Sequence, residues 1–284
     1  MNNMWSIGIY TGQSPFNLTS ALRIANPVLT FESVTDVPAE FVADPFMIPV
    51  AGVWYMFFEV LNRQTNKGEI GLATSSDGLA WNYRQIVLTE PFHLSYPYVF
   101  ECRGDFYMVP ETLEANKVSL YKSTSFPTDW SYVGELVHGR CADPSIFHFN
   151  QLWWMFACST PYLHDTLRLY FAPELTGPWT EHPNSPIVAG NKVCARPAGR
   201  VVVLDDKIVR FSQDCVPEYG TRVRAFEISQ LTTTRYLEAE HQRSPVLTAS
   251  SDRWNGMRMH HIDPHFKSDG EWIACVDGYG VVSD

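Results

Sequence analysis

The chain alternates short apolar or aromatic runs with turn residues, and this arrangement returns five times. In the first repeat the runs cover 45–50, 53–59 and 69–74, and Ala51-Gly52 forms the first turn. Runs of this length, rich in β-branched and aromatic residues and bounded by turn residues, predict strands. No segment of a dozen residues shows the 3.6-residue period of an amphipathic helix. The pattern therefore predicts an all-β protein.

Each repeat opens with a proline that follows a polar residue. These openings are Asp44-Pro45, Tyr96-Pro97, Asp143-Pro144, Arg196-Pro197 and Asp263-Pro264. Successive openings are about 50 residues apart, with one longer step before the last, which is close to the period of propeller blades. We therefore predict a five-bladed β-propeller. An N-terminal strand at residues 5–10 is expected to complete the last blade, because closing the ring removes open sheet edges.

Length and composition agree with a single domain over residues 1–284. Of the 284 residues, 45% are hydrophobic and 14% are aromatic, which is enough to build a large core. The net charge is −10, and lysine and arginine form no cluster. Nucleic acid is excluded as a partner because its phosphates require a basic surface, and an anionic membrane is disfavoured for the same reason.

Targeting signals and reactive cysteines are not evident. The chain has no run of 18 apolar residues, so no membrane span is predicted. The start Met1–Trp5 lacks the charged and apolar regions of a signal peptide, and a cytoplasmic protein is expected. The six cysteines are far apart and form no C-x-x-C pair, which favours reduced core thiols. We expect no cofactor.

Propeller geometry brings polar residues of different blades to one mouth of the central tunnel. The first strand of each blade lines the tunnel and the second returns antiparallel to it, so the start of one and the end of the other share a mouth. The first-strand starts are Asp44, Tyr96, Asp143, Arg196 and Asp263, and the second-strand ends are Glu59, Glu111, Ser159, Asp214 and Asp277. His93 and His261 precede two of these strands, and Arg200 approaches the same funnel.

Crowded carboxylates at a partly buried tunnel mouth suggest acid–base chemistry on sugars. Burial, like-charge repulsion and neighbouring arginines push their pKa values apart, so one stays protonated while another is ionised. Glycoside hydrolysis uses such a pair, because one acid protonates the leaving oxygen and one carboxylate activates water or attacks carbon. Structural alternatives stay open. The Asp-Pro carboxylates can cap their own turns, and Glu59, Glu111 and Arg196 can serve as ion-pair partners.

The segment His260–His265 contains three histidines and one aspartate, which raises the question of a metal site. Its spacing lacks the helical H-E-x-x-H arrangement of zinc enzymes. Hydrogen-bonded structural roles or a sugar contact are favoured, and no metal is expected.

Two repeats resemble those of a known enzyme family. Ala43-Asp44-Pro45 and Ala142-Asp143-Pro144 are similar to blades one and three of the five-bladed glycosidases of glycoside hydrolase family 43 and the related fructosidases. The resemblance implies that Asp44 is the general base or nucleophile and that Asp143 orients and tunes the acid. Family 43 places its general-acid glutamate at the start of blade four, where this chain has Arg196. Glu111 is the replacement we expect, with Asp214 and Glu59 behind it.

A closer resemblance is to the N-terminal domain of the plant glucosamine inositolphosphorylceramide transferases. It covers most of residues 40–280, and its motifs lie at 93–101, 213–224, 254–261 and 272–278. The plant proteins carry a separate transferase module. The resemblance therefore implies a link to a glycosyltransferase, and it does not carry transferase activity over to this chain.

The sequence thus favours a glycoside hydrolase that acts on a glycan or glycoconjugate through Asp44, Glu111 and Asp143. Substrate contacts are expected from Glu59, His93, Tyr96, Arg196, Arg200, Asp214, His261 and Asp263. A carboxylate or phosphate on the sugar would suit the two arginines. The alternative is a non-catalytic carbohydrate-binding propeller that serves a separate glycosyltransferase. A protein-interaction propeller is disfavoured, because its rim would be apolar.

Overall fold

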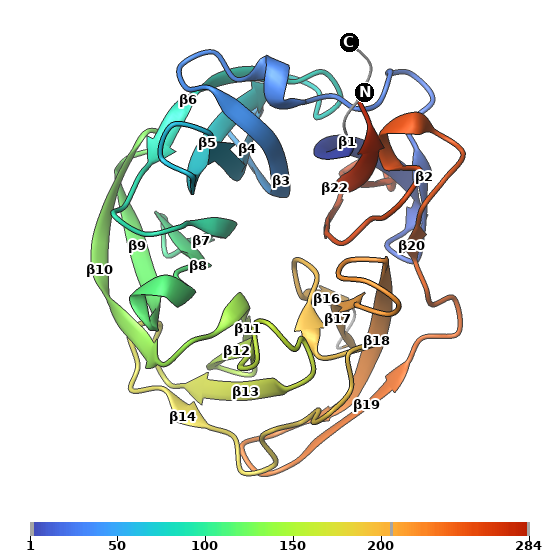
Figure 1. Cartoon of the computed structure of the whole chain (residues 1–284). Helices are drawn as coiled ribbons and strands as arrows, with labels where there is room; N and C mark the ends of the chain where they lie inside the picture. The colour runs from blue at the N-terminus through green and yellow to red at the C-terminus, as the bar shows by residue number, and fades with distance from the viewer. Residues whose placement is uncertain (1–2, 205–206, 283–284) are drawn as a thin grey trace.

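The computed structural model describes residues 3–204 and 207–282, which form five β-sheets arranged around a central axis (Figure 1). Four of the sheets have four strands and one has six. The described residues contain no α-helix, and the 3₁₀ turns are η1 (Phe31–Ser33), η2 (Leu113–Ala115) and η3 (Arg253–Asn255). Among these residues no helix is long and apolar enough to cross a membrane. The prediction of an all-β, five-bladed propeller is confirmed.

The first three blades are each built from consecutive strands. Blade one consists of β3 (Ala39–Val50), β4 (Val53–Asn62), β5 (Lys67–Ser75) and β6 (Asn82–Leu88). Blade two consists of β7 (Ser95–Cys102), β8 (Asp105–Glu111), β9 (Lys117–Ser125) and β10 (Asp129–His138). Blade three consists of β11 (Ala142–Phe149), β12 (Leu152–Cys158), β13 (Leu167–Ala172) and β14 (Thr180–Glu181).

Blades four and five depart from this simple order. Blade four consists of β15 (Arg196–Pro197), β16 (Val202–Leu204), β17 (Lys207–Asp214), β18 (Arg222–Leu231), β19 (Tyr236–Glu240) and β20 (Leu247–Thr248). Blade five consists of β21 (Ile262–Phe266), β22 (Trp272–Val281), β1 (Asn3–Ser14) and β2 (Asn17–Ser20). β1 pairs with β22 from Asn3 opposite Val281 to Gly12 opposite Trp272, so the two ends of the chain close the ring as predicted (Figure 1).

β3, β7 and β11 share an irregularity at the step before proline. The register of each strand against its neighbour shifts there. Asp44, Tyr96 and Asp143 have φ values of 51°, 48° and 51°, a left-handed conformation that non-glycine residues seldom adopt. Bulges of this kind re-aim side chains and are common beside functional sites. Three blades therefore place their pre-proline side chain in the same way.

Blade four lacks this bulge and instead bends after two residues of its first strand. The bend is at Gly199, whose φ is 125°. A Cβ at Gly199 would lie 1.8 Å from the carbonyl oxygen of Ile262, so only glycine allows this close approach to blade five. Gly199 thus lies between β15 and β16, in close contact with blade five.

The core consists of four apolar clusters of buried side chains. Trp81, Trp130 and Trp179, which recur in blades one to three, pack on these clusters. Each donates its indole N–H to a carbonyl of the preceding turn. Apolar packing therefore accounts for most of the interior. The polar side chains at the tunnel mouth are buried without being part of these clusters.

Candidate functional site

The pairing of first and second strands brings the predicted rim residues to one mouth of the tunnel. The pairs at this end are Ala43–Glu59, Ser95–Glu111, Ala142–Cys158, Arg196–Gln213 and Ile262–Val276. Each strand start therefore lies beside a strand end, as the propeller geometry requires. Hydrogen bonds then join neighbouring blades across the mouth.

Asp143 is held by side chains of blade four and is only 1% exposed. Arg196 donates from Nε to Oδ2 (2.6 Å) and from Nη2 to Oδ1 (3.2 Å). Gln213 Nε2 also donates to Oδ2 (2.8 Å). A bidentate arginine pair with a further amide donor favours the ionised form of a carboxyl group. Asp143 is therefore present as a carboxylate whose charge Arg196 balances.

Glu111 is the second carboxyl group beside Arg196. Its Oε2 accepts the backbone N–H of Asp143 (3.1 Å) and lies 3.5 Å from Arg196 Nη2. Burial and repulsion from Asp143 raise the pKa of Glu111 to about 8, although Arg196 opposes this shift. Glu111 therefore holds a proton at neutral pH and can donate it to an oxygen of a ligand.

Asp44 occupies the same position in blade one but receives no such donors. It is 5% exposed, and its Oδ1 has no hydrogen-bond partner among the described residues. The nearest ring nitrogens are His261 Nδ1 at 3.6 Å and His260 Nε2 at 3.9 Å, beyond hydrogen-bond reach. Burial, followed by repulsion from Asp143 and Asp277, raises the pKa of Asp44 well above its ordinary range.

Asp277 fixes both His260 and the backbone of Asp44. Its Oδ1 accepts from His260 Nδ1 (2.8 Å), and its Oδ2 accepts the Asp44 N–H (3.1 Å). Donor atoms of these three residues lie within 4.8 Å of one another, a grouping that would suit a divalent cation. A cation bound there would compete with the hydrogen bond between His260 and Asp277. Hydrogen bonding accounts for the positions of His260, Asp277 and the Asp44 backbone.

His261 is fully buried, and neither of its ring nitrogens has a partner in the described part of the chain. The rings of Phe46 and Tyr96 meet it edge-on at 4.6 and 5.3 Å. Burial lowers the pKa of His261 to about 4, so the imidazole is uncharged at neutral pH. Asp44 thus faces an uncharged ring and gains no cation from it.

Glu59 and His93 form a pair at the edge of the mouth. His93 Nε2 lies 3.1 Å from Glu59 Oε1, and the Gly68 N–H donates to His93 Nδ1 (2.9 Å). Although burial works against it, the hydrogen bond and attraction to Glu59 raise the pKa of His93 to about 9, whereas the Gly68 N–H at Nδ1 favours the neutral tautomer. Nε2–H donates to Glu59 in either form, so His93 is a fixed wall residue of the mouth.

Several predicted substrate contacts are engaged by the protein itself. Asp263 is fully buried and accepts from Arg200 Nε (2.5 Å) and from the backbone N–H of Met47 (2.7 Å). Asp214 is buried and accepts from Arg224 Nη2 (2.8 Å). These contacts link strands and blades, and they favour structural roles for Arg200, Asp263 and Asp214.

Tyr96 is also buried deep in the tunnel wall. Its hydroxyl hydrogen-bonds Ser145 Oγ (2.8 Å) and accepts the Gly199 N–H (2.5 Å). It thereby ties blade two to blades three and four below the mouth, and its ring is fully buried. This arrangement also favours a structural role.

A hollow of about 300 Å³ opens on the Arg196 side of the mouth, and its lining includes His93, Glu111, Tyr162, His164, Arg196 and Tyr219. Arg196 Nη1 lies 3.1 Å from His164 Nδ1, and its guanidinium lies 4.9 Å from the Tyr219 ring. Burial and Arg196 lower the pKa of His164 to about 4, so this imidazole is uncharged as well. We call this space the Arg196 hollow. Its size falls at the lower end of small-molecule sites.

Among the lining residues of the Arg196 hollow that were not chosen from the sequence, His164 and Tyr219 lie against Arg196. His164 belongs to the loop after β12 and has a φ of 57°. Tyr219 belongs to the loop after β17 and precedes Gly220. Both loops lie outside the repeating strand pattern, so the repeat carried no signal for them. Tyr219-Gly220 did form part of the resemblance to the plant domain.

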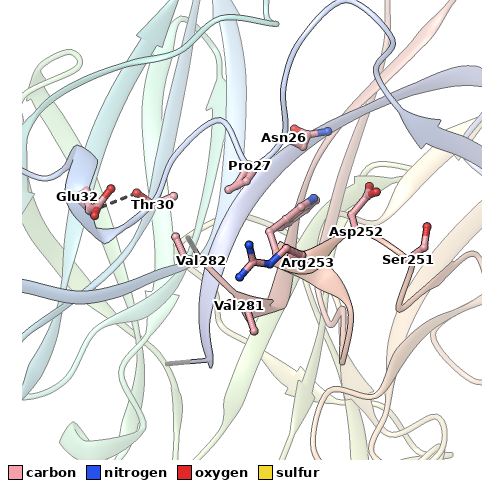
Figure 2. A pocket seen from close by; sticks show the side chains of 10 residues that line it. Asn26, Pro27, Thr30, Glu32, Ser251, Asp252, Arg253, Val281 and Val282 are labelled. Carbon is pink, nitrogen blue, oxygen red and sulfur yellow. Dashed lines mark hydrogen bonds between the residues drawn. The ribbon is translucent and has the colours of Figure 1, made fainter. Parts of the chain in front are cut away.

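A separate hollow of about 540 Å³ lies beside η3, between the loop after β2 and the end of β22. Figure 2 shows Asp252 and Arg253 next to Asn26 and Val281 at this place. None of the predicted site residues lines it. The Arg196 hollow, which predicted site residues do line, is therefore the candidate site.

Comparison of sequences gives a match over almost the whole chain. The family model described as "Glucosamine inositolphosphorylceramide transferase 1, N-terminal" matches residues 1–279. Glucosamine inositolphosphorylceramide transferase 1 of Oryza sativa subsp. japonica is 36% identical over an alignment of 301 positions, which covers 98% of this chain and 40% of the relative. The Arabidopsis thaliana protein of the same name is 34% identical over an alignment of 302 positions, which covers 98% of this chain and 39% of the relative. The chain spans about two fifths of the length of these curated relatives.

Solved structures with a similar fold are glycoside hydrolases and related enzymes. A structure from the family 130 mannoside phosphorylases and hydrolases has a TM-score of 0.64 at 12% identity, covering 90% of this chain and 92% of its own. A thermostable family-43 glycoside hydrolase has a TM-score of 0.60 at 12% identity, covering 88% and 93%. A family 117 glycoside hydrolase from Zobellia galactanivorans has a TM-score of 0.55 at 13% identity, covering 86% of each chain. At these identities the similarity shows the fold alone.

Proposed function

The chain belongs to the family of the N-terminal domain of glucosamine inositolphosphorylceramide transferase 1, and from that premise we propose that its tunnel mouth binds an uncharged sugar of a glycan or glycoconjugate without hydrolysing it. The bound sugar would serve a glycosyltransferase, as the name of the relatives suggests. The observation that carries the proposal is the pairing of Arg196 with Asp143 at the position where the resembling hydrolases have their acid.

The cationic charge in the Arg196 hollow is balanced within the protein, and Glu114, an exposed carboxylate on its lining, accepts the backbone N–H of His93. Arg196 is neutralised by Asp143, Glu111 retains its proton, and His164 is uncharged. A ligand carboxylate or phosphate would have to compete with Asp143 for the guanidinium. Uncharged hydroxyl groups face no such competition, because they can accept from Glu111 and from the Nε2–H of His164, whose Nδ1 already accepts from Arg196. These contacts favour a neutral sugar over an anionic one.

A hydrolase would need a carboxylate that is both ionised and open to its substrate. Asp143 is ionised but engaged by three donors. Asp44 is the remaining candidate; burial raises its pKa, and its Oδ1 has no hydrogen-bond donor among the described residues. A protonated Glu111, an Asp44 whose pKa is raised and an Asp143 carboxylate that is already engaged give an acid without a ready base, which supports binding rather than hydrolysis.

A glycosidase is the second candidate function, and one observation favours it. A glutamic acid with a pKa of about 8 at the edge of a hollow is suited to protonate a leaving oxygen. In that case Asp44 would have to lose its proton when substrate binds. A glycosidase would lose turnover on Asp44→Asn, whereas a binding protein has no turnover to lose.

The proposal can be tested by titrating the protein with neutral sugars and with their uronic acid and phosphorylated counterparts. Binding is detected by saturation-transfer NMR or calorimetry. Suitable neutral probes are galactose, mannose, N-acetylglucosamine and myo-inositol. We expect binding of a neutral sugar, and we expect His164→Ala to weaken it about tenfold because one hydrogen bond is lost. His138→Ala is the matched control, since His138 is an exposed residue of β10.

The same samples are then incubated with the matching oligosaccharides, and released sugar is measured. The proposal expects no release from wild type. If wild type releases sugar and Asp44→Asn lowers this release by a factor of about a hundred or more, the function is hydrolysis rather than binding. Tighter binding of the charged counterparts than of the neutral sugars would contradict the neutral ligand.

A further inference from the structure

A second hollow lies on the other side of Tyr219. It has a volume of about 690 Å³, and its lining includes Trp5, Glu40, Phe41, Tyr219, Arg258 and Tyr279. Tyr219 also lines the Arg196 hollow, so one side chain separates the two spaces. We call the second space the Phe41 hollow. It lies where blade five, through β1 and β22, meets blade one at β3.

A second bulge in β3 shapes the Phe41 hollow. Ala39 is opposite Asn62 and Val42 is opposite Val60, so β3 has one residue more than β4 between these pairs. In a regular strand Glu40 and Phe41 would point to opposite faces of the sheet. A bulge re-aims side chains and is common beside functional sites. Here both residues line the same hollow.

Neither Glu40 nor Phe41 contributes to the packing of the fold. Phe41 is only partly buried and belongs to none of the four apolar clusters. In the described part of the chain, no aromatic ring packs on it and no cation lies over its ring. Glu40 is exposed, and within the described residues its carboxylate forms no ion pair or hydrogen bond. An aromatic face and an acceptor are therefore both open to a ligand.

Arg258 supplies a hydrogen-bond donor to the same space. Its guanidinium lies 4.1 Å from the Tyr279 ring, and Nη1 donates to the Tyr219 carbonyl oxygen (3.3 Å). Its Nε is buried and has no partner among the described residues. Arg258 also lies 3.4 Å from Glu218, which balances its charge. The Phe41 hollow thus combines an aromatic face, an acceptor and a donor.

We infer that the Phe41 hollow is a second sugar subsite, which takes the neutral pyranose unit next to the one in the Arg196 hollow. The inference rests on the proposed function. The apolar C–H face of a pyranose packs on an aromatic ring, while its hydroxyl groups donate to a carboxylate and accept from a guanidinium. The ligand is then a disaccharide or longer, and it passes over Tyr219.

The test compares sugars of increasing length on wild type and on variants of each hollow. The probes are mannose, galactose and N-acetylglucosamine, each as monosaccharide, disaccharide and trisaccharide, and the readout is the dissociation constant by calorimetry. For the sugar that binds, we expect the trisaccharide to bind at least tenfold more tightly than the monosaccharide. Phe41→Ala and Glu40→Gln should each remove most of this gain and change the monosaccharide affinity by less than about twofold.

Two further variants separate local from general effects. Phe266→Ala removes an exposed aromatic residue of β21 that lines neither hollow, and it should leave the gain intact. His164→Ala, in the Arg196 hollow, should weaken monosaccharide and trisaccharide by the same factor. Because Glu40 is exposed and Phe41 lies outside the core, the variants are expected to fold.

The outcomes that contradict the inference differ from those that contradict the proposed function. Monosaccharide binding without a gain on lengthening, or a gain that survives both Phe41→Ala and Glu40→Gln, refutes the second subsite and leaves the first. Absence of binding by every sugar of the panel refutes the proposed function and, with it, the subsite that depends on it.

Discussion

Asp44 and Asp143 have the same local structure and opposite surroundings. Both precede proline, both lie at a bulge, and both have a φ of 51°. Asp143 receives three hydrogen bonds from blade four, whereas Asp44 Oδ1 receives none from the described residues. The repeat therefore determines where these carboxyl groups lie, and the neighbouring blade determines their charge.

The difference bears directly on function. In blade three the next blade offers Arg196 and Gln213, and the carboxylate is stabilised by them. In blade one the nearest groups are the uncharged His261 and an imidazole already bonded to Asp277. A carboxyl group in the second setting resists ionisation, so it is poorly suited to act as a base.

The largest effect is expected from Arg196→Met, which would leave Asp143 buried without its cation. Removing one partner of a buried ion pair costs about 3–5 kcal/mol, and we expect the free energy of unfolding to fall by that amount in urea denaturation at pH 7. Arg103→Met is the matched control, because Arg103 is 81% exposed and its ion pair should contribute little. Adding Asp143→Asn to Arg196→Met should restore part of the loss. If the double variant is no more stable than the single one, the pairing of charges does not explain the role of Arg196.

A smaller effect separates the two aspartates. Asp143→Asn should lower the free energy of unfolding by about 2–3 kcal/mol, because hydrogen bonds to a charged group are lost. Asp44→Asn should change it by less than about 1 kcal/mol, since asparagine resembles the protonated acid that the site already favours. Both are measured by urea denaturation at pH 7. Equal losses in the two variants would show that Asp44 is also stabilised as a carboxylate.

The third effect is expected in the pH dependence of stability, and it concerns Glu111. Its pKa rises from an unfolded value of 4.5 to about 8, so its favourable contribution is complete below 4.5 and is lost as the pH rises through 8. One differently bound proton changes the free energy of unfolding by at most about 1.4 kcal/mol per pH unit. Glu111→Gln should flatten the decline in stability between pH 5 and 8, and the exposed Glu174→Gln should not. If the free energy of unfolding of Glu111→Gln declines between pH 5 and 8 as steeply as that of wild type, the raised pKa of Glu111 is contradicted.

Much of the fold could be predicted from the sequence, because its signals are local. Each Xaa-Pro step, turn and aromatic run repeats in every blade, and the strand at residues 5–10 has the alternation needed to close the ring. Propeller geometry then placed Asp44, Glu111 and Asp143 at one mouth. The short β15 and the bend at Gly199 were not predicted, because they depend on a close approach to blade five.

The chemistry of the candidate site could be predicted only in part. The partners of Asp143 are 53 and 70 residues away in sequence, and no local pattern reports that they meet it. Tyr219 and His164 come from loops outside the repeat. The bulge at Glu40 and Phe41 is a matter of register between two strands, which composition does not reveal.

The most direct test of this account is a ¹³C NMR titration of the Asp44 carboxyl carbon between pH 3 and 9, with its signal assigned by comparison with Asp44→Asn. The account predicts that the signal is that of a protonated acid at pH 7, with a midpoint well above the ordinary value of 3.8. A midpoint near 3.8 would mean that the mouth holds an ionised carboxylate without a donor. Asp44 would then be available as a base, and hydrolysis rather than binding would be the function to pursue.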